Sequence, residues 1–170
     1  DYYNSIISPF YSYSTGRTKE TLRSSQVTCR DIDDDGYIEI PEDTSSKKQS
    51  SEITSQNWVN YGNTVLSHKC YSFSCKRDGY ILVIDDDDFS KVKANYDSES
   101  RKLTIIDKKN KSNVFEIVTL INSNYSVNDP KYKDYTMIMK NSGFVYLAKV
   151  NKSSDIDINI QTLKDMIKVY

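Results

Sequence analysis

Seven acidic residues and no Lys or Arg lie between residues 31 and 43, where the chain reads DIDDDGYIEIPED. Alternate residues at the start of this segment can direct three carboxylates at one centre, and Gly36 allows the backbone to turn sharply after them. Oxygen cages of this kind bind hard cations, and the spacing fits the twelve-residue calcium-loop pattern. We therefore expect a calcium site whose ligands are the side chains of Asp31, Asp33, Asp35 and Glu39 and the carbonyl oxygen of Tyr37.

The residues on either side of this loop favour strands over helices. The preceding VTCR has β-branched character, and Pro41 stands where the exiting helix of a helix-loop-helix calcium sensor should already be forming. We expect a hairpin, with Ile38 and Ile40 on one face and Glu42 turned away beyond the proline. Without a cation the acids would repel one another, and the alternative to a calcium site is an acidic surface turn that holds no ion.

Length and charge limit the classes of function. The chain has 170 residues and a formal net charge of -1 at pH 7, which suits one domain, or one domain with a small appendage, and gives no electrostatic reason to bind nucleic acid. No run approaches the roughly 18 consecutive apolar residues of a membrane-spanning helix. The three cysteines match neither a zinc ligand set nor a redox pair, so we expect ordinary thiols and at most one disulfide.

Catalytic patterns are sparse. His68 is the only histidine, and the sequence has no GxSxG, HExxH, SxxK or Gly-rich phosphate-loop motif. Most nucleophilic schemes would lack a base, so we expect no enzymatic activity. A hydrolase would require the fold to bring together distant acids such as Glu116 and Asp134.

Strand patterns dominate the rest of the chain. Alternating runs predict strands near residues 57–61, 64–75, 80–84, 101–107, 113–121, 135–140 and 143–150. Asp78-Gly79 predicts a tight hairpin, and the acidic run after residue 84 predicts a solvated connection with about one helical turn.

A helix is expected at the end of the chain. Ile156, Ile160, Leu163 and Ile167 recur at spacings of four, three and four, which is one face of a helix that Asp155 or Asp157 would cap. The order of elements predicts an α+β fold, an antiparallel sheet with a C-terminal helix. The polar stretch before Asn57 divides it into a small β segment (1–44), a linker (45–56) and an α+β domain (57–170).

The acidic loop also carries a resemblance. TCRDIDDDGYIEIP, preceded by NSIISPF and TLR, resembles the strand-loop-strand calcium segments of FG-GAP type β-propeller blades in bacterial extracellular proteins. The likeness spans about residues 4–43 and implies that Asp31, Asp33, Asp35 and Glu39 are calcium ligands. Because the chain is too short to complete a propeller, the resemblance implies a terminal blade or a remnant.

The later part of the chain is similar to the domain that follows such a loop in uncharacterised secreted lipoproteins of low-GC Gram-positive bacteria, and its order of elements resembles PsbP-like domains. The matching motifs are Trp58, Gly79-Tyr80, Phe115-Glu116-Ile117, Tyr146-Leu147-Ala148 and Thr162 to Ile167. This chain departs from the pattern at Asp85 to Phe89, where relatives often carry Pro-x-Trp.

Together these observations favour a noncatalytic extracellular or cell-surface module with a structural calcium ion, and we expect a monomer. The resemblance to secreted lipoproteins implies a lipid anchor in the full precursor. The alternative is a domain that binds a cell-surface partner, glycan, peptide or small molecule. The 14 tyrosines could supply a stacking surface on one sheet face for such a ligand.

Overall fold

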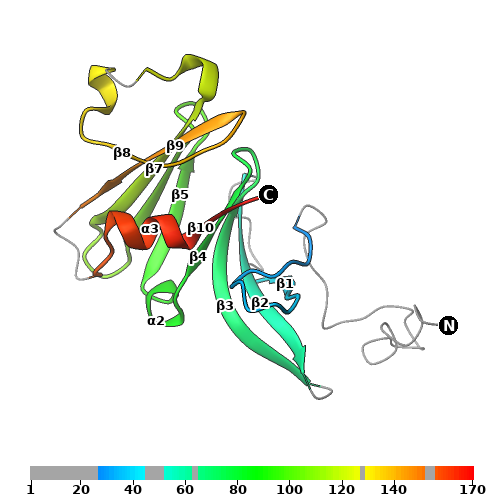
Figure 1. Cartoon of the computed structure of the whole chain (residues 1–170). Helices are drawn as coiled ribbons and strands as arrows, with labels where there is room; N and C mark the ends of the chain where they lie inside the picture. Colours follow the sequence, from blue (N-terminus) through cyan, green and yellow to red (C-terminus); the bar gives the residue numbers. More distant parts are fainter. Residues whose placement is uncertain (1–26, 45–51, 63–64, 127–128, 152–155) are drawn as a thin grey trace.

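The computed structural model describes residues 27–44, 52–62, 65–126, 129–151 and 156–170, which form two antiparallel sheets of five strands (Figure 1). The first has the order β1-β2-β3-β4-β10, with β1 at Ile40–Asp43, β2 at Ile53–Gly62, β3 at Val65–Cys75, β4 at Tyr80–Ile84 and β10 at Ile167–Val169. The second has the order β5-β6-β7-β9-β8, with β5 at Val92–Asp97, β6 at Lys102–Asp107, β7 at Asn113–Ile121, β9 at Phe144–Val150 and β8 at Thr136–Lys140.

The helices of the described residues are few and short. They are α2 (Asp86–Phe89), α3 (Ile160–Met166) and the 3-10 turns η3 (Asn122–Asn124) and η4 (Pro130–Tyr132). The expected α+β class therefore holds in a broad sense, with far more strand than helix. Among the helices of the described ranges, none has the length and apolar character needed to cross a bilayer.

The predicted Asp-Gly hairpin is confirmed between β3 and β4. Gly79 adopts a positive φ of 70°, which glycine reaches without strain, and its N–H donates to the Cys75 carbonyl at 3.0 Å. The predicted helical turn in the acidic run is also present, as α2.

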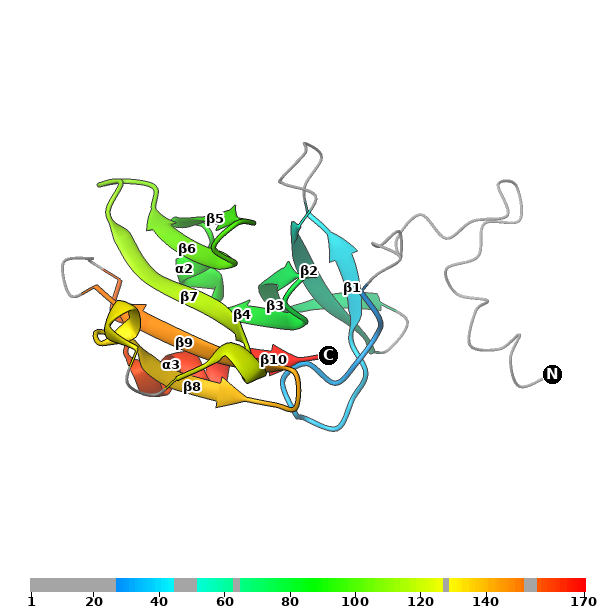
Figure 2. The ribbon, with the colours of Figure 1, turned by 90° about the horizontal axis from the view of Figure 1, so that it is seen from above.

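One apolar core lies between the two sheets, which Figure 2 shows as separate layers. Its large buried members include Phe73, Tyr80 and Leu82 from the first sheet and Leu103, Phe115 and Tyr146 from the second. Leu163 of α3 packs into the same core. Burial from both sheets therefore stabilises one common interior.

A second, smaller apolar cluster covers the opposite face of the first sheet. Trp58 and Ile81 are fully buried there, because Val27 and Ile32 from the segment before β1 pack on them. Ile81 faces away from its neighbours Tyr80 and Leu82, as alternation along a strand requires. The acidic loop is thus held against this face by its own apolar residues.

The structure corrects the end of the expected linker. Residues 53–56 are the first residues of β2, and β1 pairs with β2, so the expected small segment and domain share one sheet. The polar composition misleads here because Gln56 is buried and its Oε1 accepts a 2.6 Å hydrogen bond from Ser74. The remaining linker residues 45–51 lie outside the described residues, as do residues 1–26 of the expected small β segment, which include the start of the blade resemblance.

The expected C-terminal helix is shorter than its apolar spacing suggested. It begins after Asn159, whose side chain accepts hydrogen bonds from the N–H groups of Gln161 and Thr162 at 2.8 and 3.0 Å. Asn159, and not Asp157, is therefore the cap, and Asp155 lies outside the described residues. Ile167 leaves the helix and pairs with Leu82 as the first residue of β10, because the open edge of β4 offers backbone partners.

Candidate metal centre

The acidic loop is closed at its base by a short backbone bridge. The Arg30 N–H donates to the Glu39 carbonyl at 3.2 Å, and the Glu39 N–H donates to the Arg30 carbonyl at 2.9 Å. The Arg30 guanidinium also donates to the Val169 carbonyl of β10 at 3.0 Å. With Ile32 buried beneath it, the loop has fixed ends and a fixed floor.

Side chains of the loop organise its own backbone. The Asp31 carboxylate accepts hydrogen bonds from the N–H groups of Asp35 (3.0 Å) and Gly36 (2.9 Å). Asp34 and Gly36 adopt positive φ angles of 62° and 89°, a conformation that Gly and Asp tolerate better than most residues. These turns fold the backbone back so that alternate acids face one side.

Four of the five predicted ligand residues come together. Each of Asp31, Asp33, Asp35 and Glu39 offers one carboxylate oxygen, and these four oxygens lie within 4.8 Å of one another. Oxygens bound on opposite sides of one calcium ion lie about 4.6–5.2 Å apart, given calcium–oxygen distances of about 2.3–2.6 Å. The acids therefore could hold a metal ion, and their spacing is compatible with calcium.

Glu39 is the most unusual member of the group. Its side chain is fully buried, and its Oε2 accepts a 3.0 Å hydrogen bond from the Ile32 N–H. Its Oε1 has no hydrogen-bond partner among the described residues. Burial, followed by the charges of Asp33 and Asp35, raises the pKa of this carboxyl, against the hydrogen bond from Ile32. An unpaired buried carboxylate oxygen is costly, and a cation beside it would remove that cost.

The segment that leads from the loop into β1 buries its acid and exposes the two residues before that acid. Ile38 is 60% exposed and Tyr37 is 69% exposed, whereas Glu39 between Ile38 and Ile40 is fully buried. This reverses the usual preference of the residue types. The predicted common face of Ile38 and Ile40 is therefore the outer face, and the inner face carries the predicted ligand.

Positive charge reaches the loop from other strands. Lys69 Nζ of β3 lies 2.5 Å from Asp35 Oδ2 and 3.1 Å from Asp33 Oδ2. Lys168 Nζ of β10 lies 2.6 Å from Asp34 Oδ2. Hydrogen bonds to Asp35 and Asp33 raise the pKa of Lys69, and the bond to Lys168 lowers the pKa of Asp34.

These lysines could not be inferred from the loop itself, which contains no basic residue. To predict from the sequence that these lysines contact the loop, one would need to know which distant strands lie beside it.

Two further predictions concern Tyr37 and Glu42. The Tyr37 N–H donates to Asp35 Oδ1 at 2.9 Å, and its carbonyl remains a predicted ligand. Glu42 lies outside the acid group in β1, where its Oε2 accepts a 3.0 Å hydrogen bond from Asn57. The expectation that Glu42 turns away beyond Pro41 is consistent with this contact.

His68 and Cys70 do not form a catalytic pair. The β2–β3 register is interrupted at the residue between them, and His68 lies against Tyr71, with ring centroids 4.5 Å apart, and 2.8 Å from Asp86. Cys70 instead packs against the Trp58 cluster. His68 and Cys70 therefore lie on different faces of β3 although they are two residues apart, because the irregularity shifts the alternation.

All three cysteines are free thiols, as expected. Cys29 is exposed, Cys70 is half-buried and Cys75 is buried. Burial is the largest cause that raises the pKa of both Cys70 and Cys75 to about 12, so neither is an activated nucleophile.

Several described tyrosines occupy packed positions, whereas Tyr37 and Tyr170 are exposed. Tyr80 and Tyr146 meet edge-on in the main core at 5.5 Å between ring centroids, and Tyr71 stacks on Phe89 at 4.3 Å. Such positions fill the interior and the sheet surface. They give no specific support to a Tyr-lined binding face within the described part of the chain.

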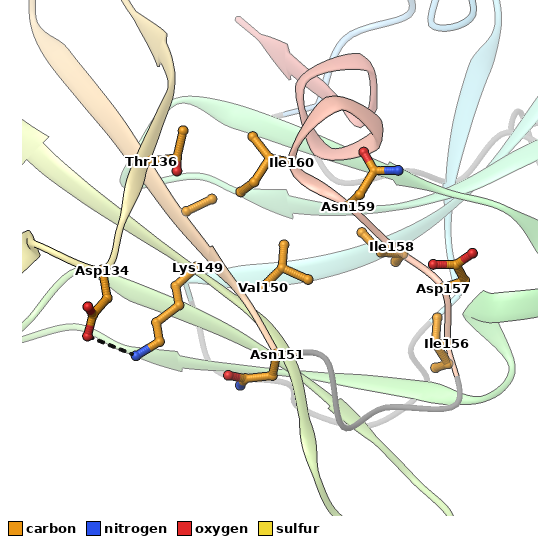
Figure 3. A pocket seen from close by; sticks show the side chains of 11 residues that line it. Asp134, Thr136, Lys149, Val150, Asn151, Ile156, Asp157, Ile158, Asn159 and Ile160 are labelled. Carbon is orange, nitrogen blue, oxygen red and sulfur yellow. Dashed lines mark ion pairs between the residues drawn. The ribbon is translucent and has the colours of Figure 1, made fainter.

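A cavity of about 470 Å³ lies between the β8–β9 pair and the segment before α3 (Figure 3). Asp134 and Lys149 form an ion pair of 3.6 Å at one side, and Ile158 and Ile160 line it from the other. Glu116 has a separate partner, because its Oε2 accepts a 2.6 Å hydrogen bond from the Tyr135 hydroxyl. The two acids that a hydrolase would need thus engage different groups.

Neither protein-family models, nor curated proteins, nor solved structures give a match to this chain.

Proposed function

We propose that this chain is a noncatalytic extracellular or cell-surface module in which a calcium ion has a structural role. The side chains of Asp31, Asp33, Asp35 and Glu39 would hold the ion, with the Tyr37 carbonyl as a further oxygen donor. The observation that carries the proposal is the buried Glu39 carboxylate, whose Oε1 has no partner in the described part of the chain while three other acids converge beside it.

The ion would fasten the loop to the first sheet. The four carboxylates are dispersed in the unfolded chain, so binding to the folded state adds to the free energy of unfolding. Extracellular calcium modules have dissociation constants of about 0.1–1 mM. At about 2 mM calcium, such a site would contribute about 0.6–1.8 kcal/mol.

The cellular setting is part of the proposal. A weak calcium site suits an extracellular module better than a cytosolic sensor. The likeness of the loop to FG-GAP calcium segments, and of residues 57–170 to PsbP-like domains of secreted lipoproteins, supports this setting and a lipid anchor in the full precursor. Strand-dominated architecture with a short helix near the C-terminus is compatible with that likeness.

Thermal unfolding tests the proposal. The melting temperature of the wild-type protein should rise by about 1–7 °C between excess chelator and about 2 mM calcium, since 1 kcal/mol shifts a protein of this size by about 2–4 °C. Circular dichroism is a sufficient readout.

Two variants of the same loop sharpen the test. Asp33→Asn removes one of the four acids, and Asp34→Asn makes the same charge change at a residue that pairs with Lys168 outside the group. Asp33→Asn should lose most of the calcium-induced rise, and Asp34→Asn should keep it. Equal rises in both variants, or none in the wild type, would contradict the proposal.

A further inference from the structure

Lys69 owes its position to a β-bulge in β3. The register pairs Trp58 with Cys70 and Val59 with His68, which leaves Lys69 without a partner across the ladder. An inserted residue of this kind re-aims its side chain and is a common device beside functional sites. Here the side chain reaches the acidic loop, more than thirty residues earlier in the sequence.

The Lys69 ammonium engages half of the proposed centre. It contacts the carboxylates of Asp33 and Asp35 at 3.1 and 2.5 Å. Within the described residues its ion pairs include neither of the other two acids, and the Oε1 atom of Glu39 remains unpartnered. The lysine thus partly neutralises the group and leaves its buried acid unsatisfied.

A calcium ion and this ammonium would compete for the same oxygens. An ion bound about 2.3–2.6 Å from the oxygens that now face Lys69 would lie less than about 6 Å from Nζ. At that separation, charges of +2 and +1 repel each other strongly in a partly buried site.

We propose that Lys69 is an internal competitor that holds Asp33 and Asp35 when no ion is bound and releases them when calcium binds. This inference rests on the proposed calcium function and adds a means by which the protein sets the calcium affinity of the site. Calcium binds only to molecules in which Lys69 has released the two acids. The apparent calcium affinity is therefore the intrinsic affinity multiplied by the fraction of such molecules. Because Lys69 makes two partly exposed ion pairs, each worth about two- to threefold, this reduction is about 3- to 10-fold.

Calcium titration by calorimetry tests the inference with a matched control. Lys69→Met removes the competitor, and Lys168→Met removes an equally exposed lysine that pairs with Asp34, outside the four-acid group. Lys69→Met should bind calcium about 3- to 10-fold more tightly than the wild type. Lys168→Met should change the affinity less than about twofold, which measures the general effect of losing one nearby charge.

A second measurement follows Lys69 in the intact wild-type protein. On calcium addition, the NMR signals of its ε-methylene group should move toward the values of solvent-exposed lysines, and those of Lys168 should stay in place. Lys69→Gln provides a second variant if Lys69→Met does not fold.

The outcomes separate the two proposals. Calcium binding to the wild type with unchanged or weaker binding to Lys69→Met, and no change in the Lys69 signals, would overturn the competitor role and leave the calcium site standing. Binding to Lys69→Met but not detectably to the wild type would support strong competition. No binding to any of the proteins would overturn both proposals.

Discussion

Replacing Glu39 with Gln should have opposite effects with and without calcium. In the Glu39→Gln variant, the amide oxygen can still accept the hydrogen bond from the Ile32 N–H that Glu39 Oε2 accepts at 3.0 Å. The amide nitrogen then takes the place of the unpartnered Oε1 and presents donors to Asp33 and Asp35. The variant therefore satisfies the buried group without an ion and removes one ligand charge.

The magnitude follows from the burial of Glu39. Leaving a buried polar group unsatisfied costs about 1–3 kcal/mol, which corresponds to a rise in melting temperature of about 2–12 °C in chelator when the variant removes that cost. The raised pKa of Glu39 means that its carboxyl takes up a proton at a higher pH than an ordinary glutamate does, so the stabilisation by the variant should shrink as the pH falls. In calcium, the variant should lose most of the contribution of about 0.6–1.8 kcal/mol expected for the ion.

The assay is differential scanning calorimetry of both proteins in excess chelator and in about 2 mM calcium. Glu42→Gln is the control, because Glu42 lies three residues further along and bonds to Asn57 outside the acid group. Its melting temperature should differ from that of the wild type by the same amount in both buffers. Destabilisation of Glu39→Gln in chelator together with a full calcium-induced rise would show that Glu39 neither lacks a partner nor binds the ion.

Two further predictions concern the interior. Asp78 is fully buried, with Arg101 Nη2 at 2.6 Å from its Oδ1. Arg101→Met should lower the free energy of unfolding, measured by urea denaturation, by about 3–5 kcal/mol, because it leaves a buried charge without its partner. Adding Asp78→Asn to this variant should recover part of that loss, and additive losses would argue against the pair. Thiol labelling of the native protein, followed by mass spectrometry, should modify exposed Cys29 first, because burial raises the pKa of Cys70 and Cys75 to about 12; equal labelling of all three would contradict the packing.

Local patterns in the sequence predicted the elements with short-range causes. The hairpin at Gly79 and the acid group from Asp31 to Glu39 depend on residues close together in the chain, so spacing and turn chemistry are sufficient to locate them. Strands β6, β7, β8 and β9 of the second sheet were predicted from their apolar patterns, whereas β5 was missed because its polar residues predicted a solvated connection.

Features that depend on distant contacts were missed. Gln56 looks like a linker residue until Ser74 is known to lie beside it, and Ile167 fits a helical face until the edge of β4 is known to be open. Lys69 is the clearest case, because its approach to Asp33 and Asp35 requires an irregularity in the β2–β3 register. No local sequence pattern predicts that irregularity.

The most direct test of the proposed metal centre is a crystal structure from crystals grown with calcium, in which the anomalous signal identifies the ion. We predict one calcium ion bound by Asp31, Asp33, Asp35 and Glu39 at about 2.3–2.6 Å from their oxygens, with Glu39 Oε1 no longer unpartnered. The crystals should be grown at a calcium concentration well above about 1 mM, the weak limit for extracellular modules. The proposal would be contradicted by well-ordered density for the four acids with no ion among them.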